Sequence, residues 1–168
     1  MKAIALKIPF RPIALGLVVL LFSGVLLERA QAGGGHFFPP VTDPLVREEC
    51  GSCHLAFAPS MLPKSSWMRM MGDLKNHFGD DASVDAAKTE RITRYLNANA
   101  ADSGSQRTGS KFLRGVSMEN GPLRITELPK WVSEHRGISP AEWKSKKVGS
   151  KANCVACHFD AERGYYDE

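Results

Sequence analysis

The chain has 168 residues, of which 43% are hydrophobic and 24% are charged, and its formal net charge is +4. This length allows one or two small domains. The positive charge belongs largely to residues 1–32, which hold four of the 22 basic and one of the 18 acidic residues. The remaining chain has a net charge of +1, which gives no reason to expect nucleic-acid binding.

Residues 1–32 have the features of a secretory signal peptide. A basic start is followed by an apolar run of 15 residues (13–27) and then by the small-residue sequence Ala30-Gln31-Ala32. An uncleaved membrane anchor is the alternative, but the run is shorter than the roughly 20 residues that span a bilayer. We therefore predict export, with cleavage after Ala32.

The sequence Cys-x-x-Cys-His occurs twice, at residues 50–54 and 154–158, and is the attachment sequence of a c-type haem. The two thiols form thioethers with the porphyrin, and the histidine binds the iron as proximal ligand. Residues three and four apart share one face of a helical turn, so a single turn can present all three side chains to one flat ligand. The residues predicted to hold two haems are Cys50, Cys53, Cys154 and Cys157 for attachment, with His54 and His158 as proximal ligands.

Every cysteine of the chain lies in these two motifs. A zinc site could use two Cys-x-x-Cys pairs, but it would not require a histidine directly after each. Two short-loop disulfides are also compatible with an oxidising compartment. Two covalently bound haem c groups are the preferred interpretation. Because c-type haem is attached outside the cytoplasmic membrane in bacteria, this interpretation agrees with export to the periplasm.

Three helices are expected before residue 100. The second has apolar residues at helical spacing and is predicted to end at Phe78, and the third is predicted to end near Asn99. The first runs into the first haem motif. The residues predicted to start these helices are Thr42 or Asp43, Ser65 or Ser66, and Ser83 or Asp85.

The later part of the chain is less periodic. Residues 98–111 are rich in Ala, Asn, Ser and Gly, and we interpret them as a linker between two halves. Residues 123–126 are either a short strand or an extended loop. A short helix then places Trp131 and His135 on one face, and a capping box at residues 139–142 starts another helix.

Three histidines remain as candidates for the far sides of the two irons. His77 lies on the apolar stripe of the second helix, and His135 is the nearest candidate upstream of the second motif, so we expect these two as distal ligands. For each, the alternative is a packed core histidine, and His36 is held in reserve. Methionine would raise the reduction potential, but Met118 follows the linker, which is the wrong order for the ligand of a small monohaem cytochrome.

These residues make the chain similar to the dihaem cytochrome c family of small periplasmic proteins. The haem motifs are shared by many cytochromes, and the sequences between them make the resemblance specific. Beside the motif blocks 49–54 and 153–158, the matching blocks are Phe38-Pro39-Pro40-Val41-Thr42-Asp43-Pro44, Leu62-Pro63-x-x-Ser66-Trp67, His77-Phe78-Gly79-Asp80, Tyr95-Leu96, Arg124-Ile125-Thr126, Trp131-x-x-x-His135 and Ala161-Glu162-Arg163-Gly164.

The resemblance implies a mostly α fold. A cytochrome c-like helical domain at residues 33–103 would hold the first haem, and a less regular domain at residues 104–168 would hold the second. It also implies bis-histidine ligation of both irons, which agrees with His77 and His135. The partners it implies are redox proteins, including a small oxygen-binding haem protein and membrane b-type cytochromes, with at most peripheral membrane association.

Two bis-histidine haems leave no open iron position, so the leading hypothesis is a periplasmic electron carrier and not an enzyme. A haem enzyme or gas-binding protein with one open iron site, like a peroxidase, is the alternative, although this chain is much shorter than the dihaem peroxidases. A third hypothesis is the soluble electron-transfer subunit of a membrane complex. The lysines of residues 144–151 are either a docking face or a solvated helix end.

Overall fold

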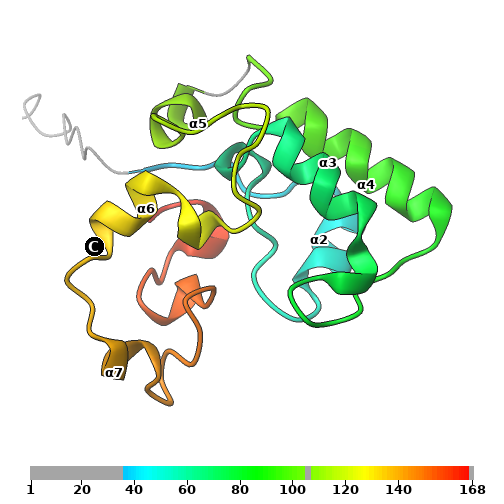
Figure 1. Cartoon of the computed structure of the whole chain (residues 1–168). Helices are drawn as coiled ribbons and strands as arrows, with labels where there is room; N and C mark the ends of the chain where they lie inside the picture. The colour runs from blue at the N-terminus through cyan, green and yellow to red at the C-terminus, as the bar shows by residue number, and fades with distance from the viewer. Residues whose placement is uncertain (1–35, 105–106, 167–168) are drawn as a thin grey trace, which may run out of the picture. The chain divides into compact units, whose positions relative to one another are not determined.

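The computed structural model describes residues 36–104 and 107–166 of the chain (Figure 1). The predicted signal peptide, residues 1–32, lies outside these ranges. The described residues belong to one compact unit, and the division into domains at residues 33–103 and 104–168 stays a prediction. Within the described ranges, no helix has both the length and the apolar character needed to cross a bilayer.

The described chain is helical and almost without strands, as the sequence predicted. Two of the predicted acidic caps are confirmed. The carboxylate of Asp43 accepts hydrogen bonds from the first backbone N–H groups of α2 (Pro44–Gly51). The carboxylate of Asp85 accepts one from Lys88 N, at 2.9 Å, and begins α4 (Ala86–Asn99). Both helices start where an N-cap satisfies N–H groups that have no partner within the helix.

The helix predicted to reach Phe78 is shorter than expected. It forms α3 (Lys64–Gly72), and a separate 3-10 turn, η2 (Leu74–Asn76), follows. Asp73 lies between them with φ −143° and ψ 53°, so it interrupts the helical hydrogen bonding. As a result the predicted apolar stripe divides, and Trp67 is buried whereas Phe78 is 39% exposed.

The predicted linker at residues 98–111 is in fact packed into the fold. Helix α5 (Arg107–Phe112) begins inside it, and Ala101 is buried. A Cβ atom on Gly109 would lie 2.5 Å from the carbonyl oxygen of Ser60. The small residues therefore allow close approach of two backbones, and they do not provide a flexible connection.

The rest of the chain consists of short elements. No strand forms at residues 123–126, where a 3-10 turn begins instead. Ser139 begins the predicted helix as its N-cap, because Ser139 Oγ accepts a hydrogen bond from Glu142 N at 3.1 Å. The elements in this part are η3 (Ile125–Glu127), α6 (Pro129–Glu134), α7 (Pro140–Trp143), η4 (Cys154–Ala156) and η5 (Ala161–Arg163).

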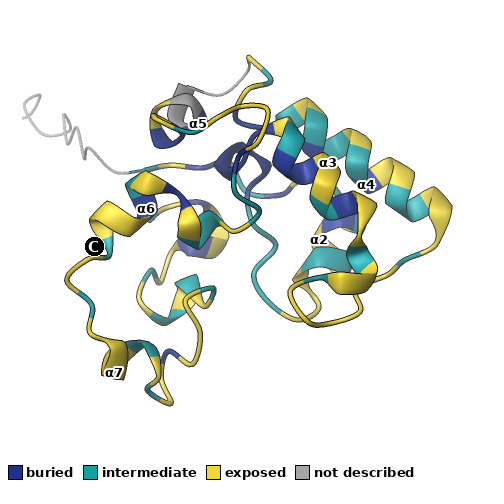
Figure 2. Ribbon diagram, in the orientation of Figure 1, coloured by how far each residue is buried: buried dark blue, intermediate teal, exposed yellow. Residues whose placement is uncertain are grey.

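A hydrophobic core joins the early helices to the later segments (Figure 2). Its fully buried side chains come from both parts of the chain, as Leu62 and Ile92 do before the predicted linker and Leu128 does after it. Ser66 is also fully buried, and its hydroxyl donates a hydrogen bond to the carbonyl oxygen of Pro122 at 2.8 Å. Helix α3 is thereby attached to residues that lie more than 50 positions later.

The two ends of the described chain pair with each other. The N–H of Phe38 donates to the carbonyl oxygen of Gly164 at 2.9 Å, and that of Tyr166 donates to the carbonyl oxygen of His36 at 3.3 Å. Gly164 has φ +89°, and a Cβ atom on it would lie 2.2 Å from the Phe38 oxygen. This pairing therefore requires glycine, and it fixes the segment that follows the second haem motif.

Replacing Gly164 by alanine should destabilise the fold by about 3 kcal/mol, through left-handed strain plus the overlap with Phe38. Gly115 is the matched control, because it has φ +83° and no atom within 4 Å of its Cβ position. Gly115→Ala should cost only the strain, about 1–2 kcal/mol. Urea unfolding of the haem-loaded proteins measures the free energy of unfolding of both variants. Equal losses of stability in the two variants would show that the fold relieves the overlap with Phe38.

Acid should weaken the start of α2. Asp43 accepts hydrogen bonds from Arg91, at 3.0 Å, and from backbone N–H groups, which hold the pKa of this carboxyl below its ordinary value of 3.8. Its contribution to stability is therefore present above pH 3.8 and is lost as the pH falls through the lower folded pKa. Asp43→Asn keeps a good N-cap residue but removes the ion pair, so the unfolding midpoint of the variant should fall less steeply in acid.

The control for this prediction is Asp85→Asn, which makes the same change at the N-cap of α4. Asp85 has no ion pair among the residues that the structure describes. This variant should therefore keep the acid dependence of the parent protein. Identical pH profiles for the two variants would contradict the role given to the Asp43–Arg91 pair.

Candidate haem sites

The structure brings the four candidate axial histidines together as two facing pairs. The ring centroids of His54 and His77 are 6.1 Å apart, with an angle of 18° between their planes. Those of His135 and His158 are 6.0 Å apart, with an angle of 74°. A metal bound to two imidazole nitrogens at about 2 Å each holds the ring centroids about 6 Å apart. Both pairs therefore have the separation that one iron between them requires.

Backbone carbonyls fix the orientation of one ring in each pair. His54 Nδ1 lies 2.7 Å from the carbonyl oxygen of Leu55, and His135 Nδ1 lies 2.8 Å from that of Trp131. A carbonyl oxygen can only accept a hydrogen bond, so Nδ1 carries the proton in both rings. The lone pair of Nε2 is then free for a metal, which is the usual arrangement for a ligating histidine.

His77 lies in a tight turn and not on a helix. Its backbone forms a small bridge with Asp80, and the next two residues, Phe78 and Gly79, have φ of +57° and +112°. The sequence argument that placed His77 on a helical stripe is therefore wrong, although the structure does turn the ring toward His54. A non-glycine residue with positive φ is uncommon and often occurs at functional sites.

The environment of His77 favours the neutral imidazole. Burial is the main cause that lowers the pKa of His77, and the nearby His54 lowers it further. Its Nδ1 atom is buried and has no hydrogen-bond partner among the described residues. A neutral ring is the form that binds a metal, so this histidine is suited to ligation before any cofactor is attached.

Aromatic side chains hold the second pair. Helix α6 ends at Glu134, and His135 follows it as the C-cap. The rings of Trp131 and His135 stack at 4.1 Å with an angle of 12°, which confirms that they share a face. Trp143 adds a further ring, 5.6 Å from Trp131 and 6.0 Å from His135. Trp131 thus positions His135 twice, by ring stacking and by its carbonyl oxygen.

The four cysteines are free, so neither of the two possible disulfides is formed. Burial raises the pKa of Cys50, with a smaller contribution from Glu49, and burial raises that of Cys154 to about 11. These thiols are therefore protonated at neutral pH. Addition of a thiol to a vinyl group is the reaction that forms the thioether of haem c.

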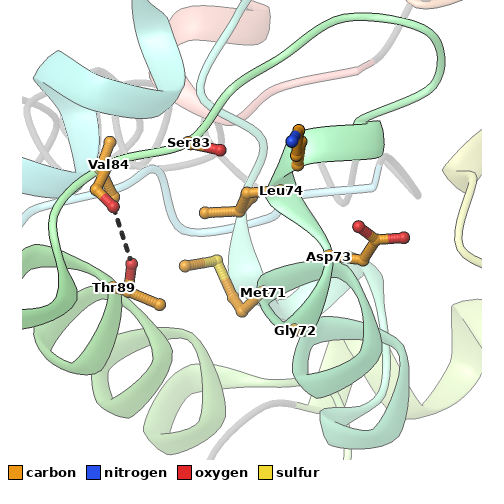
Figure 3. Close-up of a pocket in the computed structure, with 8 residues that line it drawn as sticks. Met71, Gly72, Asp73, Leu74, Ser83, Val84 and Thr89 are labelled. Atoms are coloured by element: carbon orange, nitrogen blue, oxygen red, sulfur yellow. Dashed lines mark hydrogen bonds between the residues drawn. The ribbon is translucent and has the colours of Figure 1, made fainter.

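A hollow of about 210 Å³ lies between the end of α3 and the start of α4 (Figure 3). Met71, Leu74 and Val84 give it apolar walls, and Thr89 Oγ1 donates to the carbonyl oxygen of Val84 at 3.5 Å. None of the cysteines or candidate axial histidines lines this hollow. We therefore do not assign it to the haem sites.

Arg124 and Tyr166, to which the sequence argument gave no role at the haem sites, lie near the candidate ligands. The Arg124 guanidinium lies 3.9 Å from the centroid of the Phe78 ring, and that ring lies 4.8 Å from the ring of His77. Tyr166 lies beside His158, with 5.6 Å between the ring centroids. His36, the reserve ligand, is found elsewhere, with its Nε2 atom 3.7 Å from a Glu134 carboxylate oxygen. Within the sequence, only the matching blocks drew attention to Arg124.

The chain is similar to a known protein family and to solved structures. The family model described as dihaem cytochrome c matches residues 46–166. The solved structure of a dihaem cytochrome c from Rhodobacter sphaeroides has 47% identity and a TM-score of 0.67, and the match covers 76% of this chain and 98% of that one.

A dihaem cytochrome from Shewanella baltica OS155 has 34% identity and a TM-score of 0.60, and its match covers 74% of this chain and 86% of that one. No curated protein gave a significant match. The family match spans well over half of the chain. The chain therefore belongs to the dihaem cytochrome c family, and its cofactors are two covalently bound haem c groups.

Proposed function

We propose that this protein is a periplasmic electron carrier that passes electrons between redox partners and does not perform substrate chemistry at iron. The observation that carries the proposal is that each motif histidine faces a second imidazole, at 6.1 Å in one pair and 6.0 Å in the other. When bound, each haem accepts or donates one electron at its iron. Membership of the family supports a haem c protein with a role in electron transfer.

The proposed ligands follow from the facing pairs. His54 and His77 would complete one iron, and His158 and His135 would complete the other. A porphyrin supplies four nitrogen donors, so two imidazoles fill the remaining positions and leave none for a substrate. The residues proposed for covalent attachment are Cys50 and Cys53 at the first site, and Cys154 and Cys157 at the second.

The surrounding residues would tune the potential. Imidazole in place of a methionine ligand favours lower reduction potentials. The carbonyl oxygens of Leu55 and Trp131 accept hydrogen bonds from the candidate ligands, which makes those imidazoles stronger donors. Phe159, directly after His158, is 84% exposed. A porphyrin bound at this motif would supply an apolar surface to cover such a side chain.

Export to the periplasm is supported by the signal-peptide features of residues 1–32 and by the requirement for haem attachment outside the cytoplasm. The proposed partners are redox proteins, such as a small oxygen-binding haem protein or a membrane b-type cytochrome, as the family resemblance implies. A soluble subunit of a larger membrane complex would use the same electron-transfer chemistry with a permanent partner.

An enzyme or gas-binding protein with one open iron is the rival proposal. It would require either His77 or His135 to be only a packed side chain. The separation of about 6 Å in both pairs favours ligation by both. The oxidised protein should then be entirely low-spin, and the reduced protein should not bind carbon monoxide rapidly.

Changing His77 and His135 separately to methionine should raise the midpoint potential of one haem in each variant, because methionine ligation stabilises the reduced iron. Potentiometric titration measures the shift, and electron paramagnetic resonance identifies the haem. Near-parallel imidazole planes, as in His54 and His77, give a rhombic low-spin signal, whereas near-perpendicular planes give a highly anisotropic one. His77→Met should remove only the rhombic signal.

His36→Gln is the control for this experiment, because His36 is the histidine that we do not assign to an iron. It should leave both signals and both potentials unchanged. Rapid carbon monoxide binding by the unmodified reduced protein at full stoichiometry would contradict bis-histidine ligation. Loss of either signal in His36→Gln would contradict the proposed pairing.

Removing the charge of Arg124 should lower the potential of the first haem. The guanidinium stacks on Phe78, next to His77, and a nearby positive charge disfavours the oxidised iron. We expect Arg124→Gln to lower that midpoint by roughly 20–50 mV, the effect of a partly screened charge about 10 Å away. Arg124→Lys should keep most of the potential because it keeps the charge.

Arg114→Gln is the matched control, because Arg114 is exposed and this change alters the net charge by the same amount. Its two midpoint potentials should stay close to those of the parent protein in a redox titration. An equal shift in both glutamine variants would mean that the total charge, and not the position of Arg124, sets the potential.

A further inference from the structure

Four lysines form a positively charged surface just before the second haem motif. We call Lys144, Lys146, Lys147 and Lys151 the lysine face. All four are exposed, and none has an ion pair among the residues that the structure describes. Between residues 136 and 151 the chain has five basic residues and one acidic residue. The positive charge of this surface is therefore not neutralised within the described structure.

Charge is distributed unevenly between the two haem regions. Residues 36–103 contain seven basic and nine acidic residues, whereas residues 107–166 contain eleven basic and six acidic residues. Three basic residues form ion pairs with acidic side chains in each range. They are Lys88, Arg91 and Arg94 in the first and Arg124, Lys130 and Arg163 in the second. The excess positive charge thus belongs to the part of the chain that carries the second motif.

Lys151 connects the lysine face to the second candidate site. Its Nζ atom lies 5.8 Å from the ring centroid of Trp131 and 5.9 Å from that of Trp143, within the range of a cation–π interaction. Trp131 stacks directly on His135 at 4.1 Å. A partner on the lysine face would therefore be separated from a candidate iron ligand by a layer of aromatic rings.

We propose that the lysine face docks the acidic surface of a redox protein, and that electrons pass through the second haem at this contact. The inference rests on the proposed carrier function and adds the chemistry of the partner. Complementary charge steers encounter and raises association rates, and weak electron-transfer complexes often depend on it. An acidic protein is favoured over an anionic membrane because the lysines lie in the turns that follow the four-residue helix α7, and not on an amphipathic helix with an apolar face.

The test compares two charge-reversal variants of the haem-loaded protein. Lys146→Glu with Lys147→Glu changes the lysine face. Lys64→Glu with Lys75→Glu changes two exposed lysines in the first part of the chain and gives the same net charge. The probe is the reduced form of a flavodoxin, a small acidic redox protein, and stopped-flow absorbance gives the second-order rate of haem reduction.

At low ionic strength the lysine-face variant should be reduced about tenfold more slowly than the parent protein, whereas the control should change by less than about twofold. Both differences should vanish at high ionic strength, where exposed charges are screened. Equal slowing in the two variants, or an unchanged rate in the lysine-face variant, would overturn the proposal.

Two further measurements separate this proposal from its rivals. Low-spin spectra of all three proteins should be the same, and their measured midpoint potentials allow the rates to be compared at equal driving force. High-spin iron in the parent protein would instead count against the carrier function itself. Sedimentation with phosphatidylglycerol vesicles tests the membrane alternative. If the lysine-face variant loses vesicle binding but keeps its flavodoxin rate, the surface binds membranes and the proposal is wrong.

Discussion

The structure depends on one geometric requirement, which is that two imidazole rings face each other with their centroids about 6 Å apart. Neither a regular helix nor a hydrophobic core gives this separation automatically, since packed rings can approach much more closely. Trp131 and His135, for example, stack at 4.1 Å. The facing rings are instead kept apart by the turns that carry them, and His54 and His135 are also oriented by backbone carbonyls. The turn that carries His77 is irregular, since Phe78, the next residue, has a positive φ.

The two pairs meet the requirement by different means. The first lies in the turns that follow α2 and α3, whose helices pack on α4 and the core. The second lies among short elements, where ring stacking from Trp131 replaces a framework of long helices. The difference also appears in the angle between the imidazole planes, 18° in one pair and 74° in the other. The two haems of this family member are therefore expected to differ in their electronic properties, because their protein environments differ.

Sequence patterns within a few residues predicted more of the structure than could be predicted of the contacts between distant segments. Caps such as Asp43 and Ser139 were predicted because each depends on a contact within three residues. The prediction that the helix continues beyond α3 was wrong. The apolar spacing of the sequence continues past Asp73, where the helical backbone conformation ends. Residues 98–111 were misread because small residues serve flexible linkers and close packing equally, and only the neighbouring chain distinguishes the two. His77 was predicted as a candidate ligand from its residue type and its place on an apolar stripe, and the turn that carries it was missed. The contact of Arg124 with Phe78 joins residues far apart in sequence, and no local pattern indicates it.

The two candidate haem sites differ in the charged side chains around them, as they also differ in packing. Arg124 has an exposed side chain, but its contact with Phe78 places a positive charge beside the first pair. The lysines near the second pair are exposed, and there Lys151 alone reaches the aromatic layer on His135. A charge in the first position acts mainly on the potential of an iron, whereas charges in the second act mainly on approaching molecules. In the carrier that we propose, the potential of one site and the partner of the other can therefore change independently.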